Sequence, residues 1–201
     1  MAACAGSLDH GATFMNIAIK TAIGCGIAAV LVGLIEGGDN SASRPTLPIP
    51  SDQARFVSAV LAAKAAFKSA PNQMAAGGVR SRRQQAICNA LQGQSASGWA
   101  GKIEELSSNG DGKGVVSIEL APDVHVSTWN NALSDIGSDT LIDPSSSLFK
   151  KLSSMKRGDA VSFSGRFSPS TVDCVVEKSV TLSGSMTDPD FTMRFSSISR
   201  L

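Results

Sequence analysis

Residues 99–129 read WAGKIEELSSNGDGKGVVSIELAPDVHVSTW, and the fold prediction rests on the pattern of these residues. Apolar and polar residues alternate in three runs within it, which is the two-residue period of half-buried strands. The glycine-rich segment 109–114 and the Ala-Pro-Asp segment 121–123 separate the runs and are turn signals. The stretch therefore predicts three consecutive strands with short connections.

A helix and further strands are expected downstream. Asp143-Pro144 opens a segment in which Leu148, Phe149 and Leu152 make a helical apolar face. Alternation returns at 161–167 and again at 191–195, and the apolar residues of 174–182 predict that strand structure continues between them. The order β-β-β-α-β-β is typical of the OB-fold, a five-stranded Greek-key barrel. The predicted fold is therefore mainly β, with an OB-fold domain over residues 95–201.

Residues 51–94 form a helical segment before the barrel. A helix is expected over Ser51–Lys68, with Ser51 as its cap and an apolar stripe of Phe56, Val60, Ala63 and Phe67. Pro71 and Gly77-Gly78 interrupt the pattern, and a second helix is expected from about Val79 to Leu91. Its arginines, Arg80, Arg82 and Arg83, are interpreted as a solvated face, with an anionic headgroup or partner contact as the alternative.

The N-terminal part contains the longest apolar run. After a polar segment, 1–16, in which Met15 is an alternative start, residues Ile17 to Ile35 read IAIKTAIGCGIAAVLVGLI. A helix of that length spans roughly the ~30 Å core of a bilayer. The run therefore predicts a transmembrane helix in contact with lipid. A signal peptide cleaved near 41–43, giving a secreted protein, and a buried core helix are the alternatives. Residues 36–50 are a Pro, Gly and Ser linker.

Charge is divided unevenly along the chain. The formal net charge is +1, yet from Ser95 onward ten Lys and Arg stand against thirteen Asp and Glu. Because phosphate neutralisation dominates affinity for nucleic acids, an acidic barrel disfavours a nucleic-acid binder. Lys20 precedes the core of the apolar run, whereas Glu36 and Asp39 follow it, and the positive-inside rule then places the C-terminal domain outside.

The half of the chain from Trp99 onward resembles the bacterial OB-fold family described as tRNA-anticodon-binding-like. The resembling segments are 109–114, 115–120, 128–131, 141–145, 148–152, 156–159 and 163–165. The resemblance implies a barrel with a binding face, in small proteins that are often secreted or tethered to the membrane. It does not imply tRNA binding, because a shared fold does not carry a shared function. Together with the apolar run, it leads us to expect a single-pass protein of the bacterial inner membrane with a periplasmic barrel.

The binding face of an OB-fold lies on its second and third strands and the adjoining loops. The candidate binding residues are therefore His125, Trp129, Asn130 and Asn131, with Lys150, Lys151 and Arg166 at the rim. Trp129 is the only aromatic residue expected near that face, and a core or barrel-end position is its alternative.

Catalytic and metal signatures are not found in the sequence. It contains no G-x-S-x-G, H-E-x-x-H or P-loop pattern, only two histidines, and no metal-ligand spacing among its four cysteines. We therefore expect no enzyme, no catalytic residue, no metal and no cofactor. The predicted function is a non-catalytic domain that binds a protein or small ligand in the cell envelope. The alternatives are a nucleic-acid-binding module and a structural envelope protein.

Cys88 and Cys174 are the candidates for a disulfide. Cys88 lies in the helix that leads into the barrel and Cys174 begins a late strand region. A bridge between them would staple helix to barrel and would need an oxidising compartment. Two unrelated buried thiols are the alternative.

Overall fold

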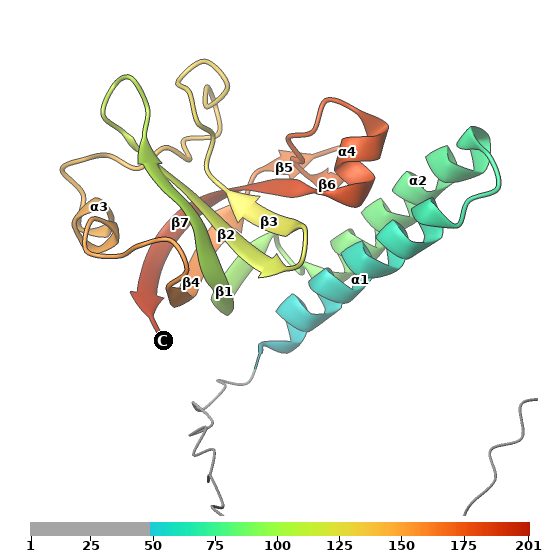
Figure 1. Cartoon of the computed structure of the whole chain (residues 1–201), viewed down its shortest axis with the longest axis horizontal. Helices are drawn as coiled ribbons and strands as arrows, with labels where there is room; N and C mark the ends of the chain where they lie inside the picture. Colours follow the sequence, from blue (N-terminus) through green and yellow to red (C-terminus); the bar gives the residue numbers. More distant parts are fainter. Residues whose placement is uncertain (1–48) are drawn as a thin grey trace, which may run out of the picture. The chain divides into compact units, whose positions relative to one another are not determined.

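Five strands close into a barrel in the computed structural model, which describes residues 49–201. The strands are β1 (Ser95–Ser108), β2 (Gly114–Ala121), β3 (Val124–Ser127), β4 (Ala160–Phe167) and β7 (Asp190–Arg200). They run round the barrel as β1-β2-β3-β7-β4, with β3 and β7 parallel and the other pairs antiparallel. With α3 (Ser147–Leu152) between β3 and β4, this topology is consistent with an OB-like barrel, and the predicted barrel is confirmed (Figure 1).

The connection from β4 to β7 differs from the prediction. It contains only two short strands, β5 (Pro169–Ser170) and β6 (Cys174–Val175), and then helix α4 (Leu182–Thr187). The prediction that strand structure continues to Leu182 was wrong because local hydrogen bonds turn the chain. The Thr181 hydroxyl accepts a hydrogen bond from the Gly184 N–H at 3.0 Å and caps α4, and Val180 is fully exposed.

Two antiparallel helices precede the barrel, α1 (Ser51–Lys68) and α2 (Gln73–Ala90), and lie side by side (Figure 1). Ser51 was predicted as the cap of the first helix, but it is the first helical residue and Pro50 occupies the cap position. The second helix begins before Val79 because the Asn72 side chain accepts the Ala75 N–H at 2.9 Å and caps it there. Gly77-Gly78 therefore lies inside the helix.

Helix α1 completes the core of the barrel. The Phe56 ring lies 5.3 Å from the Trp99 ring, 5.4 Å from the Phe167 ring and 5.0 Å from the Phe191 ring, between centroids. The Gln53 amide also donates to the Ala100 carbonyl at 2.5 Å and accepts from its N–H at 2.9 Å, as a neighbouring strand would. Helices and barrel therefore share one core and belong to one compact unit.

A buried charge cluster fastens α2 to the β4–β7 connection. Arg83 is 1% exposed, donates to the Asp173 carboxylate and the Ser185 carbonyl, and stacks over Phe191. Arg80 forms a forked hydrogen bond to the same carboxylate. Two of the three arginines that were expected to be solvated are therefore structural, because the chain supplies Asp173 opposite them; Arg82 remains exposed.

Cys88 and Cys174 lie beside that cluster. Their sulfur atoms are 2.13 Å apart and their Cα atoms 5.5 Å apart, at disulfide-bonding distance. The predicted pairing of these two cysteines is confirmed.

Within residues 49–201, no helix has the length and apolar character that a membrane crossing needs. The predicted transmembrane helix, Ile17 to Ile35, lies outside the described residues.

Candidate functional site

A polar cleft of about 330 Å³ crosses the face of β1, β2 and β3. The side chains that give it chemical character are Glu104, His125, Asn130, Lys178, Asp188 and Asp190. Strands β1 and β3 supply Glu104 and His125, whereas Lys178 and Asp188 come from the connection before β7. The cleft therefore combines the expected OB binding face with the connection between β4 and β7.

His125 lies between two carboxylates. Its Nδ1 is 2.7 Å from Glu104 Oε2, and its Nε2 is 3.1 Å from Asp188 Oδ1. The first contact has ion-pair distance without the alignment of a hydrogen bond, since Nδ1 has no hydrogen-bond partner within the described residues. A neutral imidazole donates from one nitrogen only, so it cannot satisfy both carboxylates at once.

Lys178 neutralises the inner end of the cleft. Its ammonium group is 2.7 Å from Asp190 Oδ2, donates to the Thr128 carbonyl at 3.0 Å, and lies 5.7 Å from the centroid of the Trp129 ring. The Ser127 hydroxyl donates to the other oxygen of Asp190. The Lys178 ammonium group is therefore already paired within the protein and contributes little positive charge toward a ligand.

A β-bulge explains why two successive glutamates line the cleft. In the pairing of β1 with β2, Ile103 faces Ile118 and Glu105 faces Ser117, so Glu104 is the extra residue. Side chains normally alternate between faces of a strand, and a bulge suspends that alternation locally. Glu104 and Glu105 consequently both border the cleft.

The cleft carries an excess of negative charge. Four carboxylates line it, those of Glu104, Glu105, Asp188 and Asp190, against the single ammonium of Lys178. The side chains of Glu104 and Asp188 stay 40% and 67% exposed, so they remain accessible to a ligand. A cationic group is the ligand that this arrangement favours.

Glu177 lies beside the cleft but serves the backbone. One of its oxygens accepts the N–H groups of Ser179 and Asp190, at 3.1 and 3.2 Å. Burial raises the pKa of the Glu177 carboxyl above its ordinary value, and these hydrogen bonds offset the rise only in part. Its role is to fix the turn that carries Lys178 into the cleft.

The predicted binding residues separate into two groups. His125 and Asn130 line the cleft, Trp129 is half-buried beneath Lys178, and the Asn131 amide donates to the Asn130 side chain at 2.8 Å. The three basic residues expected at the rim lie elsewhere. Lys150 and Lys151 are exposed on α3, and Arg166 is on β4, whose neighbours are β1 and β7.

Five charged residues of the cleft were missed from the sequence: Glu104, Glu105, Lys178, Asp188 and Asp190. A simple alternation along β1 gives no sign of the bulge at Glu104. The Asp188-Pro189-Asp190 segment carries a turn signal, and only the barrel topology reveals that this turn lies beside β3, where His125 pairs with Asp190.

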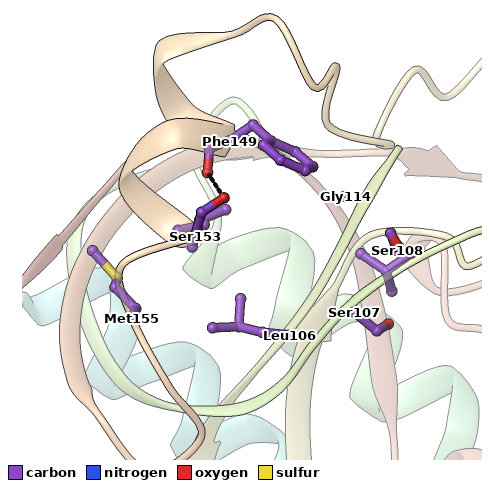
Figure 2. A pocket seen from close by; sticks show the side chains of 9 residues that line it. Leu106, Ser107, Ser108, Gly114, Phe149, Ser153 and Met155 are labelled. Atoms are coloured by element: carbon purple, nitrogen blue, oxygen red, sulfur yellow. Dashed lines mark hydrogen bonds between the residues drawn. The ribbon is translucent and has the colours of Figure 1, made fainter. Parts of the chain in front are cut away.

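A second hollow, of about 360 Å³, lies between α3 and the adjoining ends of β1 and β2 (Figure 2). Its apolar lining comes from Leu106, Phe149, Leu152 and Met155. The Ser153 hydroxyl at its edge donates to the Phe149 carbonyl at 2.9 Å and is therefore already satisfied (Figure 2). Because no charged group lines this hollow, the polar cleft is the better candidate for specific recognition.

No group of three or more His, Cys, Asp or Glu side chains in residues 49–201 is arranged to hold a metal ion. The cleft itself offers one imidazole and four carboxylates as hydrogen-bonding and charge-pairing groups.

Comparison with protein-family models finds no match to the chain, and a search of curated proteins finds none either. The resemblance to the tRNA-anticodon-binding-like family stays a prediction.

Proposed function

We propose that this protein is a non-catalytic binding domain whose acidic cleft takes a cationic group of a protein or small ligand. The observation that carries the proposal is the position of Glu104 and Asp188, two partly exposed carboxylates on either side of His125. An incoming ammonium or guanidinium group replaces water at these carboxylates and relieves their mutual repulsion. Charge-assisted hydrogen bonds of this kind are among the strongest that a surface site makes.

The size and lining of the cleft support a small cationic group. A volume of about 330 Å³ lies at the lower end of ligand sites, enough for a lysine or arginine side chain or a short polyamine. The half-buried Trp129 ring lies behind Lys178, 5.7 Å from its ammonium group, and is an apolar group next to the cleft. The amide of Asn130 provides a neutral donor and acceptor at the mouth.

The same charges argue against nucleic acid on this face. OB-folds that bind single strands use stacking aromatics beside a basic groove. Here the face has one half-buried tryptophan and four carboxylates, which repel phosphate. The charges on the strands where an OB-fold would bind therefore give no support to the alternative function, a nucleic-acid-binding module.

The binding function predicts a charge-selective titration. Trp129 fluorescence is expected to change saturably with a pentalysine peptide at low salt and to stay constant with pentaglutamate. Glu104→Gln and Asp188→Asn should each weaken binding about tenfold, the effect of one lost charge-assisted hydrogen bond. Spermidine in a parallel titration distinguishes a small amine from a protein segment as the ligand.

Asp139→Asn is the matched control for those variants. Asp139 is exposed in the loop after β3, lies outside the cleft, and changes the net charge equally. If it weakens pentalysine binding as much as Asp188→Asn does, the attraction is a property of net charge and the cleft is not the site.

We further propose that the apolar run Ile17 to Ile35 tethers this domain to the bacterial inner membrane, with the barrel in the periplasm. The proposal is supported by the length of the run, its flanking charges and the Cys88–Cys174 pair, which is stable in an oxidising compartment. Protease added to intact spheroplasts is expected to degrade the barrel while a cytoplasmic marker survives. Survival of the barrel until lysis contradicts the topology, and a mature N-terminus near residue 43 identifies cleavage.

A further inference from the structure

Two arginines face each other on the side of the barrel formed by β1, β4 and β7. Arg166 on β4 and Arg194 on β7 are direct register partners, and Ser95 on β1 is the partner of Arg166 on its other side. Both arginines are exposed, and neither forms an ion pair within residues 49–201. Like charges directly opposite each other on paired strands are destabilising.

The surroundings of the pair contain no carboxylate that could relieve this repulsion. No Asp or Glu occurs in β4, in residues 95–103 of β1 or in residues 191–200 of β7. The polar residues beside the pair are serines, and Ser95 and Ser196 line the same hollow as the arginines, with a volume of about 500 Å³. Hydroxyl groups and guanidinium forks are both hydrogen-bond donors to oxyanions.

The backbone is irregular at the same place. The β4–β7 register shifts between Ser164 and Gly165, and the β1–β4 register shifts between Ala96 and Trp99. Gly165 is required there, since a Cβ would lie 2.6 Å from the Arg194 carbonyl oxygen. Bulges of this kind re-aim side chains and are frequent beside functional sites.

We propose that Arg166 and Arg194 form a binding site for one small oxyanion of the phosphate or sulfate class. Directly opposed residues on neighbouring strands have Cα atoms about 5 Å apart, so two guanidinium groups reach one tetrahedral anion. A bound dianion neutralises the pair and turns the repulsion into attraction. Two cations suffice for one such group but not for a nucleic-acid strand, whose binding needs a series of phosphate contacts.

This site is separate from the acidic cleft, because no residue lines both. The strands β1 and β7 contribute to each, but Ser95 and Ala96 line this hollow whereas Glu104 and Glu105 line the cleft. The barrel would thus bind a cationic group on one face and an anionic group on another. The anion site stands whether or not the cleft binds a cation.

The test follows the arginine side-chain NMR signals during titration with inorganic phosphate at constant ionic strength. We expect saturable shifts of the Nε–H signals of Arg166 and Arg194, and a melting temperature higher in phosphate than in chloride. Arg166→Ser should weaken phosphate binding at least about tenfold and remove the phosphate-specific gain in melting temperature. In chloride the same variant should melt no lower than the parent, since it loses a repulsion.

Lys150→Ser is the control, since it removes an exposed cation of α3 that lies outside the hollow. Phosphate stabilises many proteins through exclusion from their surface, and this variant measures that general effect. An equal gain in melting temperature for the parent, Arg166→Ser and Lys150→Ser overturns the site. Shifts produced by a single-stranded oligonucleotide but not by phosphate overturn the assignment of the ligand as a small oxyanion.

Discussion

Replacing Asp173 with asparagine is expected to lower the free energy of unfolding by about 3–5 kcal/mol, as when one partner of a buried ion pair is removed. The Asp173 side chain is 3% exposed and accepts hydrogen bonds from Arg83, which is 1% exposed, and from Arg80. Asparagine leaves the Arg83 guanidinium buried without a counter-charge. Urea unfolding followed by the fluorescence of Trp99, which the Phe56 contact ties to the core, measures the change.

Asp123→Asn is the matched control. Asp123 also joins the barrel to a helix, with a carboxylate oxygen 2.6 Å from Lys64 Nζ, but its side chain is 63% exposed. Exposed pairs contribute little because water and salt screen them, so a much smaller loss is expected. Equal losses of unfolding free energy for the two variants would show that burial does not increase the contribution of Asp173 to stability.

The same cluster makes stability depend on pH. Burial raises the pKa of the Asp173 carboxyl, but hydrogen bonds from Arg80 and Arg83 outweigh burial and hold that pKa below its ordinary value of 3.8. A carboxyl with a lowered folded-state pKa contributes stability above its unfolded pKa and loses it as the pH falls through the folded pKa. Below about pH 4 the parent should therefore lose stability more steeply than Asp173→Asn does. If stability falls equally with pH in the parent and in Asp173→Asn, Asp173 is not the source of the pH dependence.

Removing the disulfide link between Cys88 and Cys174 is expected to lower the free energy of unfolding by a similar amount. The two residues are separated by 86 positions, and closing a loop of that size is worth about 4–5 kcal/mol in the chain-entropy model. The Cys88→Ser and Cys174→Ser double variant should lose this stabilisation without leaving a free thiol at either position. Its melting temperature, compared with that of the oxidised parent, gives the measurement.

Reductant supplies the control for the cysteine experiment. It should lower the melting temperature of the parent to that of the double variant and leave the double variant unchanged. A parent that is indifferent to reductant, with both thiols found free after purification from its native compartment, would contradict the disulfide and weaken the periplasmic proposal.

The two stability predictions concern neighbouring residues and should not add. Asp173 and Cys174 are adjacent in sequence, and both tie α2 to the connection before β7. Once one tie is removed, local release of that connection reduces what the other contributes. A combined loss clearly smaller than the sum of the two is therefore expected.

The barrel could be predicted from sequence because the strands alternate over enough of their length to be recognised, and glycine or proline signals mark the turns between them. Val116, Ile118, Val126 and Phe163 are all buried, as their alternation indicates. The start of α2 and the connection after β4 were missed because side-chain caps, from Asn72 and Thr181, decide them. A cap depends on one hydrogen bond and produces no periodic pattern of apolar residues in the sequence.

The candidate site could be predicted only in part for a related reason. His125 and Asn130 follow from the position of β3 in an OB-like order. Glu104 faces the cleft through a bulge, and Asp188 reaches it through the parallel pairing of β3 with β7, a contact across more than 60 residues. Arg80 and Arg83 were misjudged because their partner, Asp173, lies 90 or more residues away. A local sequence pattern does not reveal the distant partner of a single charged residue.

An NMR titration locates a bound cation on the surface and shows whether it occupies the acidic cleft. In a ¹H–¹⁵N NMR titration with pentalysine, the backbone amides of Glu104, His125, Asn130 and Asp188 should shift together and saturate. The Glu104→Gln and Asp188→Asn double variant should abolish those shifts. Shifts that avoid this cleft, or shifts of the same amides by a single-stranded oligonucleotide and not by pentalysine, would contradict the binding of a cationic group in the cleft.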